Sequence, residues 1–384
     1  MNTSLPIPDP EQLEHGSRLI QIIRDEIAAQ GGKVSFARYM ELALYAPGLG
    51  YYSAGAKKFG TDGDYVTAPE ISPLFAGTLA RQAAQVLVAT GGNVLELGAG
   101  TGRLAAQVLL ELQRLGALPQ RYRILEVSAH LRSVQKETLA AGLPAELLAH
   151  VEWLEALPDT FTGLVIGNEV LDALPVHVLT WRETGIFERG VAWKDGQFVW
   201  QECLVTDSRL LRTTQGLGLP PGYISEVCPA ASGLIASLAQ MLEHGVLLFV
   251  DYGFPRCEYY HRQRASGTLM CHYRQLAHDD PFFHPGLQDI TAHVDFTAVA
   301  ETGVSHDLQL LGYTTQAQFL INCGITELLG AVSPADMTAY LPLASQAQKL
   351  LSPAEMGELF KVVALGKNMQ PLLGFGRGDK RHTL

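Results

Sequence analysis

Three polar side chains follow a buried apolar segment in the stretch "GLVIGNEVLDALPVH", which runs from Gly163 to His177. Asn168 is an amide, and Glu169 and Asp172 are carboxylates three residues apart, so the two acids would share a face if the segment were helical. A carboxylate pair can accept bidentate hydrogen bonds from a planar cation, and one of its members can take up a proton. The alternative is that Asp172 only caps a turn and Glu169 is solvated.

A glycine-rich turn occurs upstream, in "VLELGAGTGRLA". Glu96 lies at the end of a short apolar segment, Gly98, Gly100 and Gly102 follow, and a helical pattern then begins. Such glycines let the backbone turn tightly and let a ligand approach the helix N-terminus. The dinucleotide fingerprint requires glycine where Arg103 stands, and a bulky side chain there would crowd the helix–strand contact. The E-x-G-x-G-x-G spacing is instead typical of sheets that bind S-adenosylmethionine, although an ordinary strand–helix turn is the alternative.

Short apolar segments alternate with helical patterns in the middle of the chain, which predicts a parallel α/β sheet covered on both faces. The expected strands are "NVLEL", "YRILEV", "HVEWL", "GLVIGN" and "VLLFVDYG". A ligand of such a sheet lies beyond the carboxyl ends of the strands, where the strand order reverses. Glu126, Leu154, Asn168 and Asp251 lie at strand ends, and we expect these ends near the cofactor. Glu126 would accept hydrogen bonds from ribose hydroxyls, unless it is merely a surface acid.

The remaining sequence predicts helical regions before and after this alternation. Apolar residues recur at helical spacing in "GSRLIQIIRDEIAA" and "SFARYMELALY", and helix-like segments continue to about Gly366, followed by a loose tail. "SGLIASLAQMLEHG" predicts a helix with Gly245 as its C-cap. Asp195-Gly196 between alternating segments predicts a hairpin. We expect an N-terminal helical region over 1–84, a cofactor-binding core over 85–290 with a β insertion near 176–205, and a helical region over 291–384.

The composition limits the class of protein. The chain has 384 residues and a net charge of −11, so it lacks the basic footprint that nucleic-acid binding requires. Its five cysteines are far apart and form no CxxC pair, which argues against a disulfide framework or a zinc site. His272, His278 and His284 lie at intervals that no regular element brings to one face, so we expect no metal. No signal peptide or membrane span is evident, and we expect a cytoplasmic, bacterial protein.

Several motifs in fixed order resemble the MidA family of class I methyltransferases, over a span from about Ser35 to Gly366. They are "GDYVTAPEIS" (Gly63–Ser72), "LELGAGTG", "GNEVLDALPVH", "VCPAA" (Val227–Ala231), "DYGFP" (Asp251–Pro255), "GTLMCHYR" (Gly267–Arg274) and "DITAHVDF" (Asp289–Phe296). The resemblance implies a Rossmann-like class I methyltransferase sheet with an antiparallel hairpin insertion and helical N- and C-terminal regions. It further implies an S-adenosylmethionine-dependent protein arginine methyltransferase, because the family includes a mitochondrial complex I assembly factor with that activity.

The resemblance also implies roles for particular residues. Gly98, Gly100 and Gly102 would contact the methionine part of the cofactor, and Glu126 would contact the ribose. Glu96, Leu154 and Asn168 are also expected to bind the cofactor, Asn168 through the amino or carboxylate group of the methionine. "GDYVTAPEIS" would be an active-site loop whose Thr67, Pro69 and Glu70 face the cofactor. Glu169 would bind the substrate guanidinium, and Asp172 would either support Glu169 or accept a proton late in the reaction. His293 would supply an acid–base group, with a structural hydrogen bond as the equal alternative.

The partner expected on this basis is a protein that presents an arginine, and the enzyme would be a monomer or homodimer. Three other functions stay open. A methyltransferase acting on a small molecule would use the same carboxylates for an amine or hydroxyl. An assembly chaperone could keep the sheet and bind the cofactor without catalysis. A nicotinamide oxidoreductase is disfavoured by Arg103.

Overall fold

The apolar segments predicted as strands pair side by side in the computed structural model, which describes residues 5–54 and 67–384. The described residues form two compact units, and the chain passes between them several times. The first unit comprises residues 5–54, 172–233 and 256–293, and the second comprises 67–171, 234–255 and 294–384. The division into 1–84, 85–290 and 291–384 stays a prediction beside these two units.

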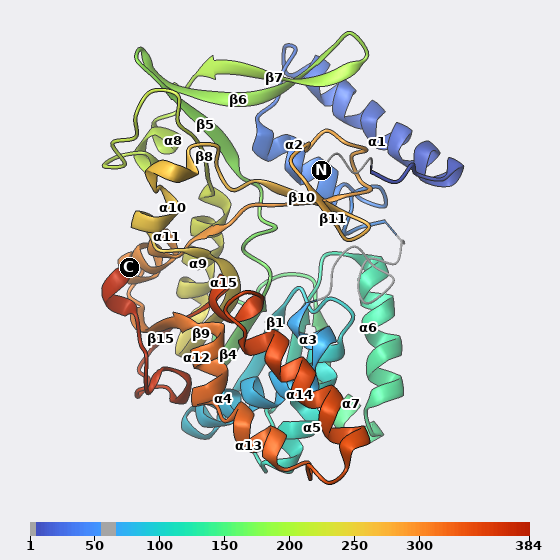
Figure 1. Ribbon diagram of the computed structural model, residues 1–384, viewed down its shortest axis with the longest axis vertical. Coiled ribbons are helices and arrows are strands. Elements are labelled where there is room, and N and C mark those ends of the chain that lie inside the picture. The colour runs from blue at the N-terminus through green and yellow to red at the C-terminus, as the bar shows by residue number, and fades with distance from the viewer. Residues whose placement is uncertain (1–4, 55–66) are drawn as a thin grey trace. The chain divides into compact units, whose positions relative to one another are not determined.

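A largely parallel sheet forms the centre of the second unit, with the strand order β14-β15-β9-β4-β1-β2-β3 (Figure 1). Its parallel strands are β1 (Asn93–Leu97), β2 (Tyr122–Leu125), β3 (Val151–Leu154), β4 (Phe161–Asn168) and β9 (Leu242–Phe254). Strand β13 (Val294–Asp295) pairs in parallel with the end of β9. The order reverses between β1 and β4, because the chain runs outward to β3 on one side and to β9 on the other.

Helices cover both faces of this sheet. On one face pack α4 (Pro73–Thr90), α5 (Arg103–Arg114), α12 (Gln316–Asn322) and α14 (Met337–Leu351), whose buried side chains join those of the alternate sheet residues Val94, Leu164 and Val362 in one core. On the other face lies α11 (Phe296–Ser305), whose Gly303 packs on Leu365. Further helices of this unit are α3 (Ala68–Ile71), α6 (Ala129–Gly142), α7 (Ala145–Leu148), α13 (Ile325–Gly330) and α15 (Met356–Leu359); α9 (Pro229–Met241) begins in the first unit and continues into this one. The predicted fold class is confirmed.

Two strands that the sequence analysis had counted among helix-like segments belong to this sheet. β15 (Phe360–Lys367) lies antiparallel between β9 and β14 (Gln309–Thr315). The residues from Val362 to Leu365 are completely buried. A strand buried on both faces is a continuous apolar run without alternation, so its period does not separate it from a helix.

Gly245 does not cap a helix, contrary to the prediction. Helix α9 ends at Met241, and Gly245 lies inside β9 opposite Gly163 of β4. Its φ is 141°, and a Cβ on Gly245 would lie 1.9 Å from the carbonyl oxygen of Gly163. The glycine is therefore required by the close approach of two strands rather than by a helix end.

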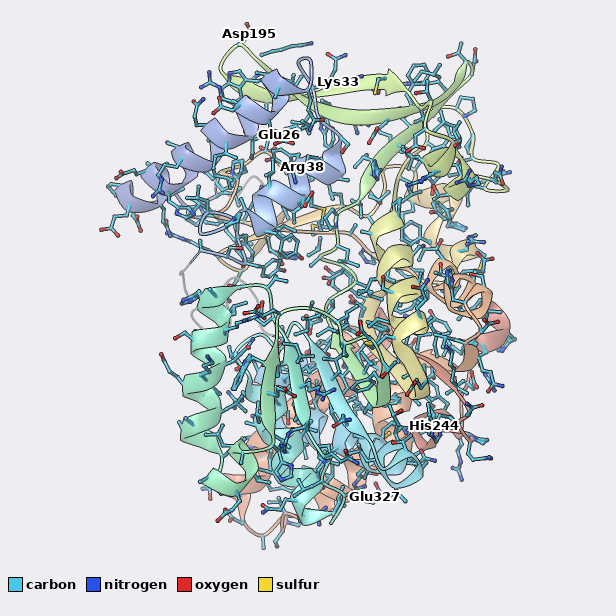
Figure 2. All side chains as sticks on the ribbon, turned by 180° about the vertical axis from the view of Figure 1, so that it is seen from behind. Glu26, Lys33, Arg38, Asp195, His244 and Glu327 are labelled. Carbon is cyan, nitrogen blue, oxygen red and sulfur yellow. The ribbon has the colours of Figure 1, made fainter. Side chains whose placement is uncertain are left out.

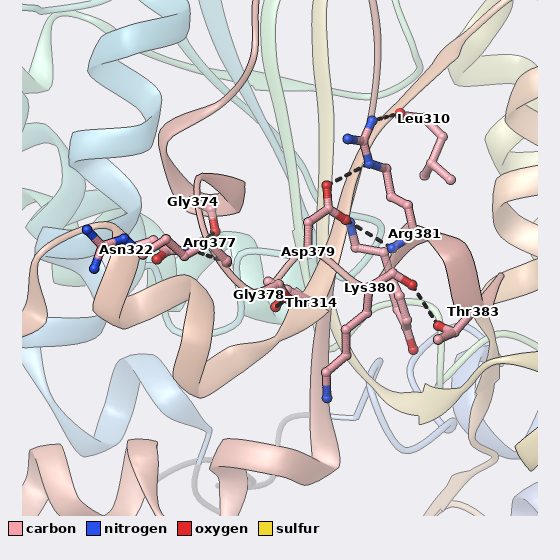
Figure 3. A network of polar contacts seen from close by, with 11 residues as sticks. Leu310, Thr314, Asn322, Gly374, Arg377, Gly378, Asp379, Lys380, Arg381 and Thr383 are labelled. Atoms are coloured by element: carbon pink, nitrogen blue, oxygen red, sulfur yellow. Dashed lines mark hydrogen bonds and ion pairs between the residues drawn. The ribbon is translucent and has the colours of Figure 1, made fainter.

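The C-terminal segment is also ordered rather than loose. Helix η2 (Leu373–Phe375) and helix η3 (Arg381–Thr383) pack on the second unit, as Figure 3 shows for the polar contacts of this segment. Asn322 donates to the carbonyl oxygens of Gly374 and Arg377 at 2.8 and 2.9 Å, and Thr314 donates to that of Gly378 at 2.8 Å. The polar composition of the segment predicted a loose tail, because composition does not reveal the hydrogen bonds that Thr314 and Asn322 make to its backbone.

The first unit combines helices with two antiparallel sheets. Helices α1 (Pro10–Ala29) and α2 (Phe36–Tyr45) form as predicted, and their apolar faces pack with the sheet β7-β6-β5-β8. The strands are β5 (His177–Arg182), β6 (Gly185–Lys194), β7 (Gln197–Leu204) and β8 (Ile224–Val227), with α8 (Ser208–Thr213) between the last two. The predicted hairpin is confirmed, since β6 and β7 pair around Asp195, which lies at the tip in Figure 2.

A smaller sheet, β11-β10-β12, completes the first unit and was not predicted. Its strands are β10 (Met270–Tyr273), β11 (Leu276–His278) and β12 (Asp289–Thr291), preceded by α10 (Arg256–Tyr259) and η1 (Arg262–Arg264). Within residues 5–54 and 67–384, we find no helix that is both long and apolar enough to cross a membrane.

Candidate active site

The carboxyl ends of β1 and β4 meet where the strand order of the sheet reverses. β1 leads into the glycine loop and β4 ends at Asn168. This is the position at which open parallel sheets bind their ligands.

The glycine loop adopts a backbone that only glycine accepts readily. Gly98, Gly100 and Gly102 all have positive φ, at 60°, 53° and 83°. A Cβ on Gly102 would lie 3.1 Å from Cα of Gln135 on α6, so the loop also packs closely against the neighbouring helix. The positive φ angles of the three glycines and the packing of Gly102 on Gln135 thus fix the shape of the loop that leads into α5.

Glu126 follows β2 and is held from two sides. Its Oε1 accepts from the backbone N–H of Ser128 at 2.9 Å, and its Oε2 accepts from Nε2 of Gln135 at 3.0 Å. Burial raises the pKa of Glu126. Gln135 also donates to the carbonyl oxygen of Gly100 at 3.1 Å and accepts from Nε1 of Trp153 at 3.0 Å. The sequence analysis missed Gln135, which joins the glycine loop to the predicted ribose acid.

Arg132 connects the ends of β2 and β3. Its Nε donates to the carbonyl oxygen of Glu126 and its Nη2 to that of Leu154, both at 2.7 Å. Arg132 therefore fixes the backbone of Leu154 at the end of β3, and a contact between Leu154 and the cofactor stays a prediction. Val127, next to Glu126, is an apolar side chain left 75% exposed.

Glu96 is buried within the sheet rather than exposed at its end. Its Oε2 accepts a 2.7 Å hydrogen bond from the hydroxyl of Tyr122 on β2. Burial raises the pKa of Glu96 to about 7, and the nearby Glu126 carboxylate acts in the same direction. A direct contact between Glu96 and the cofactor stays a prediction.

Asn168 and Glu169 lie together after β4. Nδ2 of Asn168 donates to Oε1 of Glu169 at 3.1 Å, and among the described residues the buried Oδ1 of Asn168 has no hydrogen-bond partner. Glu169 has φ 54°, a left-handed conformation that costs about 1–2 kcal/mol for a residue with a Cβ. Such strain is retained where surrounding bonds enforce it, and it is concentrated at functional sites.

Asp251 enforces this turn. The side chain is completely buried in β9, and its Oδ2 accepts from the backbone N–H groups of Val170 and Leu171 at 3.1 and 2.8 Å. The N–H of Glu169 donates to the carbonyl oxygen of Val250 at 2.9 Å. The sequence analysis placed Asp251 at a strand tip, whereas β9 continues to Phe254 and Asp251 fixes the backbone after β4.

Glu169 and Asp172 do not share a helical face, contrary to the expectation for a helical segment. The segment after β4 is a turn, because Glu169 is left-handed. Asp172 belongs to the first unit and is buried, with its backbone oxygen accepting from the N–H of Ala292 at 3.0 Å. Asp172 and His293 are therefore brought near each other in the first unit.

His293 is placed by a chain of hydrogen bonds. Its backbone N–H donates to Oγ1 of Thr268 at 3.1 Å, and Thr268 donates through its N–H and hydroxyl to Oε2 of Glu226 at 2.8 and 2.9 Å. Burial raises the pKa of Glu226. Glu226 was missed, although a carboxylate inside the apolar strand "ISEV" is a signal that could have found it.

Four tyrosines take part in the packing of the first unit: Tyr51, Tyr52, Tyr259 and Tyr260. Tyr51 and Tyr259 are buried, and Tyr52 donates from its hydroxyl to Oδ1 of Asp289 at 2.9 Å. Tyr259 stacks edge to face with Tyr260.

The motif "GDYVTAPEIS" is described only from Thr67 onward, and its residues 63–66 lie outside the described ranges. Thr67 precedes α3 and Pro69 is buried within it. Glu70 accepts from the hydroxyl of Thr101 at 2.6 Å and from Nη1 of Arg103 at 3.2 Å. Glu70 therefore contacts the glycine loop, and contacts of Thr67 and Pro69 with a cofactor stay predictions.

These groups suit S-adenosylmethionine. Among the described residues the buried Oδ1 of Asn168 has no hydrogen-bond partner and can accept from an ammonium, and Glu126 can accept from ribose hydroxyls. Gly98 is exposed and has no side chain that would keep a ligand away from the backbone of the loop. A doubly wound sheet with this glycine loop and these acids at its switch point defines a class I methyltransferase.

Comparison with known proteins identifies the family. The family profile described as "Putative S-adenosyl-L-methionine-dependent methyltransferase" matches residues 78–314, and the chain belongs to this family, which is the MidA-like group. The mouse "Protein arginine methyltransferase NDUFAF7, mitochondrial" is 30% identical over 368 residues, covering 87% of this chain and 81% of that protein. The human protein of the same name is 28% identical, with 87% and 80% covered.

Solved structures agree with this membership. A crystal structure from Burkholderia thailandensis, described as a "likely methyl transferase" bound to S-adenosyl-homocysteine, is 51% identical and superposes with a TM-score of 0.96. It covers 99% of this chain and all of that one. A second crystal structure of an uncharacterised protein from the same organism is 50% identical, with a TM-score of 0.94 and the same coverage. The predicted cofactor, S-adenosylmethionine, is confirmed, and the protein is a methyltransferase.

Proposed function

We propose that this protein methylates an arginine side chain of a protein substrate, with S-adenosylmethionine as the methyl donor. The proposal is supported by the names of the mouse and human relatives, which are protein arginine methyltransferases. The single structural observation that carries it is the strained, bonded carboxylate of Glu169 at the switch point of the sheet. By resemblance to the MidA family, the substrate would be a protein of the respiratory complex I type, met in the cytoplasm.

In this proposal the second unit holds the cofactor. The glycine loop would contact its methionine part, Oδ1 of Asn168 would accept from its ammonium, and Glu126 would accept from the ribose hydroxyls. The exposed Val127 would cover one side of the base. When bound, S-adenosylmethionine supplies an electrophilic methyl group, so the residues of the chain have mainly to position the nucleophile and exclude water.

Glu169 would bind the guanidinium of the substrate. A guanidinium has a pKa above about 12 and spreads its charge over three nitrogens, which makes each one a poor nucleophile. A carboxylate that accepts two parallel N–H bonds holds the plane and draws positive charge toward itself, away from the attacking nitrogen. Because Asn168 donates to Oε1 of Glu169 at 3.1 Å, the orientation of this carboxylate is set before the substrate arrives.

Asp172 and His293 would act after the methyl transfer. The methylated guanidinium loses one proton, which a carboxylate or an imidazole can accept. Both residues are held through their backbones, at the oxygen of Asp172 and the N–H of His293, which fixes the loops that carry them.

The test is a transfer assay with radiolabelled S-adenosylmethionine and lysate from a deletion strain, followed by identification of the labelled protein and residue. We expect Glu169→Gln to lower the transfer rate at least a hundredfold while the affinity for S-adenosyl-homocysteine changes less than threefold. Glu137→Gln, on the exposed surface of α6, is the matched control. Label in small metabolites instead of protein, or near wild-type turnover by Glu169→Gln, would contradict the proposal.

A further inference from the structure

A carboxylate of the protein itself contacts two side chains at the start of α5. Glu70 of α3 accepts from the hydroxyl of Thr101 at 2.6 Å with one oxygen, and from Nη1 of Arg103 at 3.2 Å with the other. Thr101 lies in the glycine loop and Arg103 is the first residue of α5. The Glu70 side chain is only 13% exposed, so this negative charge is poorly screened by solvent.

Arg103 does not exclude dinucleotides in the way the sequence suggests. Its side chain is 47% exposed and reaches toward Glu70, so it does not crowd the contact between the helix and the strand. The close approach at this turn is made by Gly102, whose Cβ position faces Gln135. The steric reason for rejecting a dinucleotide at position 103 is therefore wrong.

The start of the helix after a glycine loop is where dinucleotide-binding sheets hold a pyrophosphate, because the N–H groups of the first turn and the helix dipole attract an anion. In this protein the same end of α5 faces a fixed carboxylate. We propose that Glu70 is a specificity-determining residue: its carboxylate, bound to the side chains of Thr101 and Arg103, places a negative charge beside the end of α5 where a phosphate would bind, so that the loop rejects phosphate-bearing nucleotides.

The charge of the accepted cofactor fits this assignment. S-adenosylmethionine carries a sulfonium and an ammonium against one carboxylate, so its net charge is positive and it contains no phosphate. A negative group at the loop therefore favours it over a nucleotide diphosphate, whose phosphates would meet Glu70 at short range. The side chain of Arg103 is 47% exposed and that of Glu70 only 13%, so solvent screens the charge of Arg103 more than that of Glu70. The charge of Glu70, rather than the size of Arg103, thus separates the two ligand classes.

The inference is tested by calorimetric titration of the full chain with ADP and with S-adenosyl-homocysteine, at low ionic strength. In Glu70→Gln, the oxygen that accepts from Thr101 is kept and the negative charge is lost. We expect this variant to bind ADP at least tenfold more tightly than the wild type and to lose that gain at high salt. The control Glu327→Gln removes a charge from the exposed surface of α13 and should leave ADP affinity unchanged.

A second variant, Arg103→Gly, restores the dinucleotide fingerprint and separates the two explanations. If bulk at position 103 excludes nucleotides, this variant gains ADP binding. If Glu70 excludes them, the variant gains none, because Glu70 has then lost its counter-ion. A gain by Arg103→Gly, or ADP affinity of Glu70→Gln no higher than that of the control, would overturn the inference. Both readouts are independent of methyl transfer, so failure of the proposed arginine specificity would not affect them.

Discussion

The buried carboxyl of Glu96 predicts a specific dependence of stability on pH. Its pKa is raised by burial from an ordinary value of 4.5 to about 7, so the folded protein keeps a proton on Glu96 that the unfolded chain has already released. The protonated carboxyl of Glu96 therefore adds to the free energy of unfolding at low pH, and this contribution is lost as the pH rises from 4.5 to 7. At about 1.4 kcal/mol per pH unit, the whole effect is about 3 kcal/mol.

The substitution Glu96→Gln imitates the protonated carboxyl. A glutamine oxygen can still accept from the hydroxyl of Tyr122, and no charge has to be buried. We expect the variant to be more stable than the wild type at pH 8 by about 3 kcal/mol, which is about 6–12 °C in melting temperature for a unit of this size. The difference should narrow by about 2.5 kcal/mol at pH 5, because this pH lies only half a unit above the ordinary pKa of 4.5 and keeping the proton in the folded protein then costs little.

The assay is thermal and urea denaturation of the full chain between pH 5 and pH 8. Glu137→Gln reports any general effect of removing a negative charge from the second unit, since this side chain is exposed on α6. The reasoning is refuted if the difference between Glu96→Gln and the wild type is the same at both pH values, because Glu96 would then be ionised in the folded protein throughout this range.

Two further predictions concern the backbone of the site. Asp251→Asn should lower the free energy of unfolding by about 2 kcal/mol and slow methyl transfer at least tenfold, because the charged hydrogen bonds to Val170 and Leu171 are weakened and the turn at Glu169 is released. Urea denaturation and the transfer assay measure these two effects. An unchanged free energy of unfolding would argue against the role given to Asp251. Gly102→Ala should lower the free energy of unfolding by about 1–2 kcal/mol and weaken the binding of S-adenosyl-homocysteine, because the φ of Gly102 is 83° and a Cβ there would meet Gln135. The control Gly142→Ala in α6 has space for the methyl group and should leave binding unchanged in the same titration.

Local signals in the sequence predicted the elements that carry the cofactor site. Ser128 caps α6 through a bond from the N–H of Leu131, as its residue type indicated. Asp195 and Gly196 both have positive φ, which the hairpin turn requires and their types allow. The strands before Glu126 and Asn168 followed from short apolar runs, so the residues at their ends could be located without the structure.

Partners distant in the chain could not be predicted in this way. Asp251 bonds the turn around Glu169 from about 80 residues away, and Glu226 holds Thr268 from about 40 residues away. Neither spacing corresponds to a local motif. The helical reading of Glu169 and Asp172 was wrong for the same reason, since the left-handed turn is imposed by Asp251 and not by the local sequence. Strand β15 was missed because a fully buried run has no distinguishing period.

The position of β15 has a consequence for synthesis of the protein. β9 is a central strand whose one edge is paired with β4 and whose other edge is paired with residues 360–367. During translation, that second edge has no partner until more than a hundred further residues have been made. An apolar strand edge that stays unpaired for this long can form β-sheet hydrogen bonds with other unfolded chains. We therefore expect chains truncated before residue 360 to aggregate rather than to accumulate as a smaller folded enzyme.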